Sequence, residues 1–345
     1  MKITDASSFQ KKLLHWYGRT KRDLPWRKTR DPYKILVSEI MLQQTQVVTV
    51  IPYYERWLKR FPDFATLAKT DLADVLKSWQ GLGYYRRAKM LHQTAQIVAR
   101  DHRGRLPDSV DALLNLPGIG RYTAGAIASI AYDSPAPILD GNVIRILTRL
   151  FAIKQNIADK KTIANLWSLA EKLLPGKKTG DFNQAMMELG AMVCAPQNPN
   201  CKACPVAVLC SAFKAGNPEK YPVKNADAKI TKLEEYALIV RDSQKRLLVK
   251  KQQKGERWAD LWALPHFDSL EKGLSALDLK KREVMKLRQD KHGFTRYAIT
   301  LHTFQVEKKD MVCEGAYNWM DQSEIRRAAF PAVHQKILDA VLSHD

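Results

Sequence analysis

Residues 113–128 read LLNLPGIGRYTAGAIA, and this pattern predicts two helices joined by a tight Pro-Gly-Ile-Gly turn. We expect Gly118 and Gly120 to adopt backbone angles that other residues avoid. Amides at the start of the second helix would then point outward, and such helix termini bind phosphate without reading a base. The alternative is an ordinary turn between helices that ends in glycine. Arg121, directly after the turn, favours a phosphate ligand.

The chain carries a large positive charge. Its 345 residues include 56 Lys and Arg against 36 Asp and Glu, a formal net charge of +20. A surplus of this size indicates a polyanionic partner, and nucleic acid is the obvious candidate. A solvated lysine surface is the alternative. Together with the turn above, the charge favours the backbone of DNA.

The chain divides into two predicted domains. Residues 1–213 have apolar positions at helical spacing, separated by short Pro, Gly and Asp punctuation, and predict a bundle of short helices. Residues 214–232 are rich in Gly, Pro and charge and predict a linker. Residues 233–345 predict a smaller α+β domain. Its expected elements are strands at 236–240, 246–249 and 297–304, and a closing helix at 322–342 interrupted near Pro331.

Membrane and export signals are not expected from this sequence. No stretch is apolar enough to span a bilayer, and the N-terminus predicts an amphipathic helix without a signal-peptide core. We therefore expect a cytoplasmic, bacterial, nucleoid-associated protein with reduced thiols. No long heptad or exposed sticky strand is evident, so we expect a monomer.

Four of the five cysteines lie in residues 194–210: Cys194, Cys201, Cys204 and Cys210. Zinc sites usually pair two Cys-x-x-Cys clips, and this segment has one. A compact array of four thiolates with unequal gaps fits a [4Fe–4S] cluster better. Disulfides or unrelated buried thiols are the alternative. Only Cys313 lies outside the array, unlike the cysteine-rich pattern of secreted scaffolds.

The helix pair, followed by a loop with a single Asp and then by the four cysteines, resembles the endonuclease III superfamily of DNA glycosylases. Within it, SEIMLQQTQV at 38–47, GLGYY at 81–85 and LDGNV at 139–143 resemble the MutY family of adenine DNA glycosylases. The resemblance extends over essentially the whole chain and is strongest at 24–210. It implies an all-α helix-hairpin-helix glycosylase core with an iron–sulfur loop at 194–210, followed by a smaller α+β Nudix-like domain that recognises the lesion.

Two carboxyl groups are candidates for the chemistry. Glu39 has almost only apolar or amide neighbours on a predicted helix, so its pKa should be raised and it could donate a proton. A solvated helix face is the alternative. Asp140 fits a helix N-cap, which could be its whole role. The nearby amides and helix dipole would also keep it ionised, facing a sugar cation. The resemblance assigns base protonation and water handling to Glu39, and cation stabilisation to Asp140.

Tyr122 separates two kinds of glycosylase. In the bifunctional relatives that resemble endonuclease III, a lysine at this place forms a Schiff base with the sugar and drives strand cleavage. A phenol cannot form an imine, so the sequence predicts a monofunctional glycosylase that leaves an abasic site. Asn142, in the LDGNV motif, is the fourth candidate catalytic residue beside Glu39, Tyr122 and Asp140.

A base inside a duplex must be flipped out before it can react. The resemblance places three residues in or beside the duplex near the opposite base: Gln43, Leu82 and Tyr84. It places four near the adenine pocket: Arg22, Trp26, Arg27 and Gln184. Five more are predicted to contact DNA: Gln44, Thr45, Gly118, Gly120 and Arg121. Aromatic faces stack on bases, although Trp26 could equally be a core tryptophan.

The second domain resembles a Nudix module that has lost hydrolysis. The turn glycines are replaced by His266 and Phe267. The resemblance implies a magnesium-binding helix that would contain Arg282 and Glu283, but Lys286 and Leu287 stand in place of its paired glutamates. In the family, this module senses 8-oxoguanine through a Phe-Ser-His loop, which matches residues 294–296. These are Phe294, Thr295 and Arg296, and the arginine could donate to a Hoogsteen edge or to a phosphate.

These observations predict a glycosylase that excises adenine opposite 8-oxoguanine, and more weakly opposite guanine, in double-stranded DNA. Two alternatives stay open. One is a glycosylase/lyase that acts on damaged pyrimidines, against which Tyr122 and the Nudix-like extension argue. The other is a catalytically silent DNA-binding redox sensor, in which the iron–sulfur cluster is the functional element.

Overall fold

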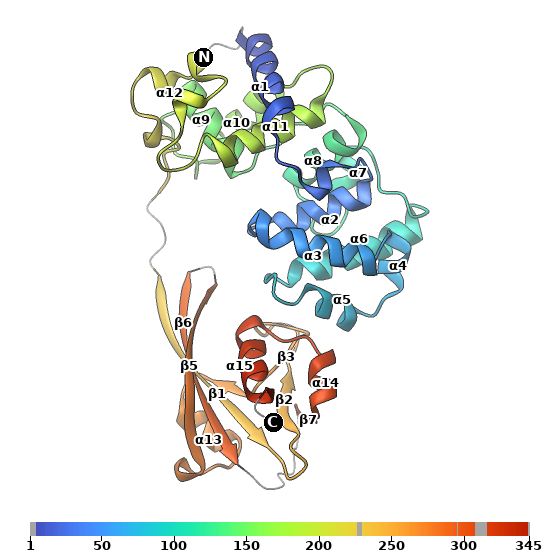
Figure 1. The fold of residues 1–345 in the computed structure, drawn as a ribbon, viewed down its shortest axis with the longest axis vertical. Coiled ribbons are helices and arrows are strands. Elements are labelled where there is room, and N and C mark those ends of the chain that lie inside the picture. The colour runs from blue at the N-terminus through green and yellow to red at the C-terminus, as the bar shows by residue number, and fades with distance from the viewer. Residues whose placement is uncertain (1–4, 226–229, 295, 308–315, 344–345) are drawn as a thin grey trace. The chain divides into compact units, whose positions relative to one another are not determined.

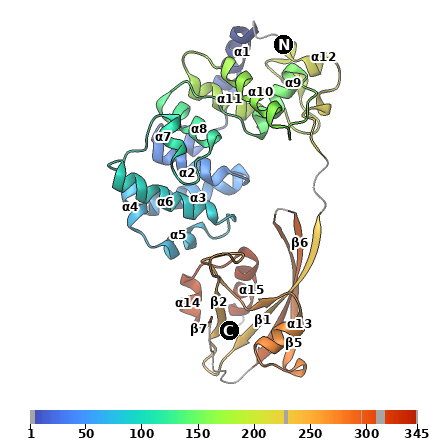
Figure 2. The ribbon, with the colours of Figure 1, turned by 180° about the vertical axis from the view of Figure 1, so that it is seen from behind.

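The structure is a computed structural model that describes residues 5–225, 230–294, 296–307 and 316–343 (Figures 1 and 2). The chain divides into two compact units. The first comprises Met1–Lys69 and Met90–Ala226, and the second comprises Thr70–Lys89 and Asp227–Asp345. Among the described residues, no helix is both long enough and apolar enough to cross a membrane.

The first unit is helical, as the sequence predicts. Its helices are α1 (Ala6–Thr20), α2 (Pro32–Leu42), α3 (Val47–Arg60), α4 (Phe64–Lys69), most of α6 (Arg86–Asp101), α7 (Val110–Leu114), α8 (Arg121–Tyr132), α9 (Gly141–Phe151), α10 (Lys160–Lys172), α11 (Thr179–Met192) and α12 (Ser211–Lys214). Short 3₁₀ turns lie at Pro25–Arg27, Cys201–Ala203, Ala207–Leu209 and Pro218–Lys220.

The predicted helix pair is α7 and α8, and its two glycines differ. Gly118 has φ +76°, and a Cβ there would lie 2.7 Å from Cβ of Met90. Gly120 has φ −92° and ψ 177°, an extended N-cap with open space around it. The expectation of an unusual backbone angle is therefore confirmed for Gly118 and wrong for Gly120, because an N-cap residue normally has extended dihedral angles that any residue can adopt.

Helix α8 is the buried centre of the first unit. Its residues from Thr123 to Ile130 are all buried, and small side chains predominate among them. Gly125 packs against the backbone of Pro137, and Gly180 of α11 packs against the backbone of Ser129. Gly180 lets α11 pack closely against α8, and α2 also packs against α8, so side chains from three distant segments can converge on one site.

The second unit is built on a mixed sheet of order β3-β2-β1-β6-β5, in which β1 and β6 are parallel and the other pairs are antiparallel. Strands β4 and β7 pair with β1 and β2 off this path. The elements are α5 (Leu72–Trp79), β1 (Thr231–Arg241), β2 (Leu247–Lys251), β3 (Trp262–Ala263), β4 (His266–Phe267), α13 (Leu270–Ala276), β5 (Val284–Phe294), β6 (Tyr297–Glu307), β7 (Tyr317–Met320), α14 (Gln322–Arg327) and α15 (Ala332–Leu342).

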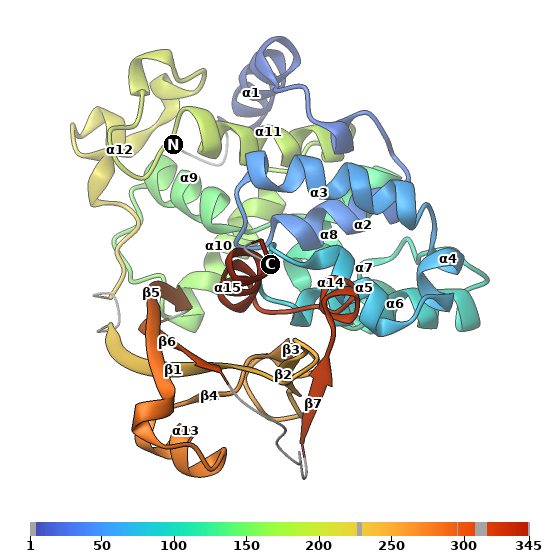
Figure 3. The ribbon, with the colours of Figure 1, turned by 60° about the horizontal axis from the view of Figure 1, so that its bottom comes forward.

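Alternation along β1 gives the sheet two apolar faces. Ala237 and Ile239 pack into a core with α14 and α15, whereas Leu238 and Val240 pack into a core with α13 (Figure 3). The three predicted strands are confirmed, and the closing helix is interrupted at Pro331 as expected.

One prediction for the second unit is wrong. Residues Lys281–Glu283 form a single 3₁₀ turn rather than part of a helix, and Lys286 and Leu287 lie on strand β5. The reason is tertiary, because β5 pairs with β6 from Val284 to Phe294, with a register shift between Lys286 and Arg288. Within the segment 214–232 that the sequence predicts as a linker, Lys214 belongs to α12 and β1 begins at Thr231.

Candidate active site

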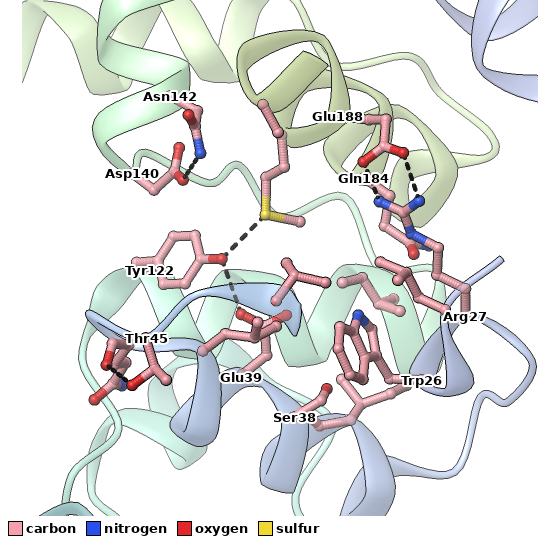
Figure 4. Close-up of a pocket in the computed structure, with 18 of the residues that line it drawn as sticks. Trp26, Arg27, Ser38, Glu39, Thr45, Tyr122, Asp140, Asn142, Gln184 and Glu188 are labelled. Atoms are coloured by element: carbon pink, nitrogen blue, oxygen red, sulfur yellow. Dashed lines mark hydrogen bonds and ion pairs between the residues drawn. The ribbon is translucent and has the colours of Figure 1, made fainter. Parts of the chain in front are cut away.

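A cavity of about 620 Å³ opens in the first unit between α2, α8 and α11 (Figure 4). It gathers residues predicted from separate parts of the sequence: Arg22, Trp26, Arg27, Glu39, Gln43, Gln44, Thr45, Tyr122, Asp140, Asn142 and Gln184. Leu82, Tyr84, Gly118, Gly120 and Arg121 are not among the residues that line it. Eleven of the 22 residues that line the cavity are therefore singled out in the sequence, and the structure brings them together.

Glu39 projects from a helix that is buried from Ile35 to Met41, and it is itself only 5% exposed. Burial raises its pKa from the ordinary value of 4.5 to about 7, and the negative charge of Asp140 adds to the rise. A hydrogen bond from Tyr122 opposes it. The predicted elevation of the pKa is confirmed, and a carboxyl with this pKa can hold a proton near neutral pH and give it away.

The hydroxyl of Tyr122 donates to Oε2 of Glu39 at 2.8 Å and lies 3.1 Å from the sulfur of Met187. Burial raises the pKa of Tyr122 well above its ordinary value, so the phenol keeps its proton. In Figure 4, Tyr122 lies between Glu39 and the pair formed by Asp140 and Asn142. The hydroxyl of Tyr122 therefore orients the carboxyl of Glu39, and the ring lies on the side of Glu39 that faces Asp140.

Asp140 is the N-cap of α9, as predicted. Its Oδ1 accepts from the amide of Val143 at 2.7 Å, and its Oδ2 accepts from Nδ2 of Asn142 at 2.9 Å. Burial raises the pKa of Asp140, while these hydrogen bonds and the charge of Arg145 lower it. The cap favours the ionised form as the sequence indicates, but burial outweighs it.

Arg145, which the sequence reasoning missed, links this carboxylate to the cysteine loop. Its guanidinium donates to Oδ1 of Asn142 at 2.8 Å and to the carbonyl of Cys194 at 2.7 Å. Gly190 of α11 allows this helix to lie close to Asn142, because a Cβ at residue 190 would lie 2.5 Å from Cβ of Asn142. The only signal in the sequence is the spacing of three residues between Asn142 and Arg145, which places both on one side of α9.

Glu188 on α11 is a second residue that the sequence reasoning missed. Its side chain is fully buried and binds the guanidinium groups of both Arg22 and Arg27 at 2.7 Å. Burial opposes its ionisation, but the hydrogen bonds from Arg27 and Arg22 hold its pKa at about 2. Glu188 lies one helical turn after Gln184, so both face the cavity.

Trp26 is a buried core residue that also lines the cavity. It is 7% exposed and packs edge-on against Tyr54, with ring centres 5.5 Å apart, yet it also forms part of the cavity wall. Beside it, Gln43 ends α2 and donates to Oγ1 of Thr123 at 3.5 Å. Gln44 has φ +56°, a left-handed conformation at the mouth of the pocket.

The N-terminus of α8 has the features expected of a phosphate site. Its N-cap, Gly120, has no side chain that could occupy the first-turn amides. Arg121 is exposed, and its guanidinium lies 4.0 Å from the centre of the Trp167 ring. The stacking holds the cation beside amides that carry the positive end of the helix dipole.

The four cysteines are free thiols that line one small cavity with Arg149. Nη1 of Arg149 lies 3.3 Å from the sulfur of Cys194. Burial raises the pKa of Cys204 to about 12, so a thiolate here needs cationic partners. Among the described residues no three His, Cys, Asp or Glu side chains are arranged to bind a single metal ion. In a [4Fe–4S] cluster, each cysteine binds a different iron, and the four residues fit that group.

The predicted recognition residues of the second unit lie at two loops. Leu82 is 6% exposed, whereas Tyr84 is 47% exposed and has φ +47°. Phe294 ends β5, with its ring centre 5.4 Å from that of Tyr297. Arg296 is exposed, and its guanidinium donates to the hydroxyl of Tyr297 at 3.2 Å. Thr295 lies outside the described residues.

Comparison with known proteins decides the family. Residues 37–172 match the HhH-GPD superfamily base excision DNA repair proteins, and residues 236–340 match the NUDIX domain. An adenine DNA glycosylase from Buchnera aphidicola of Schizaphis graminum is 35% identical over 96% of this chain and 98% of its own length. The chain belongs to the adenine DNA glycosylase family.

A further relative and two solved structures are similar to parts of this chain. The human adenine DNA glycosylase is 46% identical over 61% of this chain and 40% of its own length. A thermostable thymine-DNA glycosylase of known structure is 35% identical, with a TM-score of 0.57 over 61% of this chain and 98% of its own. Endonuclease III in a non-covalent DNA complex shares the fold at 21% identity, with a TM-score of 0.54 over 63% of this chain and 98% of its own.

Proposed function

We propose that this protein is a monofunctional adenine DNA glycosylase that acts on double-stranded DNA. It flips out adenine that is mispaired with 8-oxoguanine, or less efficiently with guanine, and hydrolyses its N-glycosidic bond in base excision repair. The observation that carries the proposal is Glu39, a buried carboxyl with a pKa of about 7, in the same cavity as Asp140.

The first step is protonation of the base. Adenine is a poor leaving group until a ring nitrogen carries a proton, and Glu39 can supply it at neutral pH because burial keeps the proton on. The hydrogen bond from Tyr122 fixes the direction of the carboxyl. Arg22, Arg27 and Trp26 line the part of the cavity where a flipped purine would lie.

The second step is support of the sugar cation. The carboxylate of Asp140, held by Val143 and Asn142, can stabilise an oxocarbenium-like centre. Glu188 also lines the cavity, but its charge is paired with Arg22 and Arg27. Glu39, deprotonated after the first step, can then accept a proton from the attacking water. The described residues that line the cavity include no lysine, which supports hydrolysis without Schiff-base chemistry.

Recognition of the substrate is divided between two regions. The amides at the start of α8 and Arg121 would hold a phosphate of the DNA backbone. We assign the residues from 233 to 345 to lesion recognition, with Phe294, Thr295 and Arg296 near the opposite base. Arg296 could donate two hydrogen bonds to the Hoogsteen edge of a purine. The protein would act as a monomer on the nucleoid of a bacterial cell.

Cys194, Cys201, Cys204 and Cys210 would hold a [4Fe–4S] cluster, which fixes the loop that carries them. Lys202 in that loop would then lie near DNA phosphates. This structural role needs no electron transfer. The hydrogen bonds from Arg145 to Cys194 and Asn142 would extend the rigidity of the loop to the active site.

The test is a single excision assay on a duplex with an adenine:8-oxoguanine pair, followed by alkali. We expect strand scission only after alkali, and none in Glu39→Gln or Asp140→Asn. Scission without alkali, or efficient trapping by sodium borohydride, would instead indicate a glycosylase/lyase. A wild type that excises no adenine, and that binds the duplex as Glu39→Gln does, would indicate a catalytically silent DNA-binding protein.

A further inference from the structure

The loop that exposes Tyr84 belongs to the second unit and is held from within. Gly81, Gly83 and Tyr84 all have positive φ, of +101°, +72° and +47°. Nε1 of Trp79 donates to the carbonyl of Gly83 at 3.0 Å. Nη2 of Arg87 donates to the same carbonyl at 3.1 Å, and its guanidinium lies 5.6 Å from the centre of the Tyr84 ring.

A left-handed backbone at a tyrosine is unfavourable and persists only where the surroundings impose it. Glycine adopts such angles freely, so Gly81 and Gly83 shape the loop without strain. Tyr84 does not share this freedom. The groups around the loop must therefore hold Tyr84 in this conformation.

Both ends of the loop are hydrogen-bonded to one C-terminal segment, residues 328–335. On one side, Nε2 of Gln80 donates to Oε1 of Gln335 at 2.5 Å. On the other side, the hydroxyl of Tyr85 donates to the carbonyl of Phe330 at 2.9 Å. Before the loop, Nζ of Lys77 donates to the carbonyl of Ala328 at 2.8 Å.

The acceptor segment is itself firmly anchored. Phe330 is completely buried in the apolar core that α14 and α15 share with the sheet. Gln335 lies on the first turn of α15, and its Nε2 donates to Asp339 at 2.6 Å. One loop end is therefore tied to a residue of the core, and the other to a partly exposed side chain on the helix that follows it.

We propose that Gln80 and Tyr85 are positioning residues, which hold Tyr84 at the angle from which it tests the base opposite adenine. The inference rests on the proposed function, and it adds a specific route from the C-terminal segment to mispair selectivity. A loose loop would still enter DNA, but Tyr84 would discriminate poorly between correct and incorrect partners. Loss of either hydrogen bond should therefore reduce selectivity more than it reduces folding.

The test uses Tyr85→Phe and Gln335→Leu in the full-length protein. We call the hydrogen bonds from Gln80 to Gln335 and from Tyr85 to Phe330 the clamp. Each substitution removes one hydrogen-bonding group of the clamp and keeps most of the side-chain volume. Matched controls are Tyr236→Phe, whose hydroxyl bonds only weakly to exposed Glu234 at 3.3 Å, and Gln322→Leu on α14, which bonds to the carbonyl of Leu342 at 3.4 Å. Single-turnover excision rates are measured on adenine opposite 8-oxoguanine and opposite guanine, together with the melting temperature.

We expect the ratio of the two excision rates to fall about five-fold in each clamp variant, as for the loss of one hydrogen bond, and to stay unchanged in both controls. Amide hydrogen exchange in residues 80–85 should become faster in Gln335→Leu, which tests the clamp even if Tyr85→Phe folds poorly. Ratios within two-fold of the wild type, with exchange unchanged, would overturn the inference. A wild type that excises no adenine from either duplex would refute the proposed function instead.

Discussion

Replacement of Tyr122 by phenylalanine should move the pH dependence of adenine excision. The hydroxyl donates to Oε2 of Glu39 at 2.8 Å and lowers the pKa of that carboxyl, so its removal leaves burial and the charge of Asp140 without this opposition. A hydrogen bond to a charged group contributes about 1.5–3 kcal/mol. Since one pKa unit corresponds to about 1.4 kcal/mol, the pKa of Glu39 should rise by about one to two units.

The sign of the effect follows from the role of the acid. Activity requires protonated Glu39, so the wild-type rate should be high at acidic pH and fall as pH rises through about 7. In Tyr122→Phe, the fall should occur at about pH 8 or above. The maximal rate should be lower, because the carboxyl loses the contact that orients it.

The measurement is a single-turnover rate from pH 5.5 to 9.5 on an adenine:8-oxoguanine duplex. Tyr132→Phe is the matched control, because it loses a hydrogen bond of 2.6 Å to the carbonyl of Leu106, outside the residues that line the cavity. Its profile should coincide with that of the wild type. A midpoint for Tyr122→Phe that stays in place or moves to lower pH would refute the assignment of Glu39 as the titrating acid.

Three further predictions concern stability and binding. Burial raises the pKa of Glu39 from 4.5 to about 7, so the ionisation of this carboxyl costs roughly 3 kcal/mol of folding free energy as pH rises through this range. Glu39→Gln should therefore unfold at a higher denaturant concentration than the wild type at pH 8.5. At pH 4.5 the variant should have little advantage. Gly118→Ala should weaken binding to DNA of any sequence and lower the melting temperature, because φ is +76° and the new Cβ would meet Met90. Gly120→Ala should be tolerated. Equal effects of the two substitutions in gel-shift and melting assays would contradict this prediction. Arg145→Ala leaves buried hydrogen-bond acceptors without a donor. We therefore expect the free energy of unfolding in urea to fall by about 2–4 kcal/mol and excision to become slower. Wild-type stability and wild-type excision in this variant would show that the link to the cysteine loop is dispensable.

The sequence predicts those parts of the site that depend on local pattern. Apolar neighbours around Glu39 indicate a buried helix, and the capping position of Asp140 follows from the residues that surround it. Gly118 is predicted for the same reason, because a tight turn between helices needs a left-handed residue.

The misses depend on contacts between distant segments. Glu188 resembles any helix glutamate until α11 is packed against the loop that carries Arg22 and Arg27. The Nudix resemblance implies a helix that contains Arg282 and Glu283, whereas the pairing of residues 284–294 with β6 makes the following segment a strand. Likewise, no local signal groups residues 70–89 with a unit whose other residues begin at 227.

That grouping constrains how the protein is made. Residues 70–89 leave the ribosome roughly 140 residues before the rest of their unit, an interval of about 7–28 seconds at ordinary rates of translation. Strand β1 also lacks a pairing partner at first, because its parallel neighbour β6 is synthesised only after β5. The nascent chain must therefore keep α5 and the loop after it from misassembly until α15 emerges. Truncation before residue 330 would deprive the Tyr84 loop of its anchor even though every residue of the loop had been made.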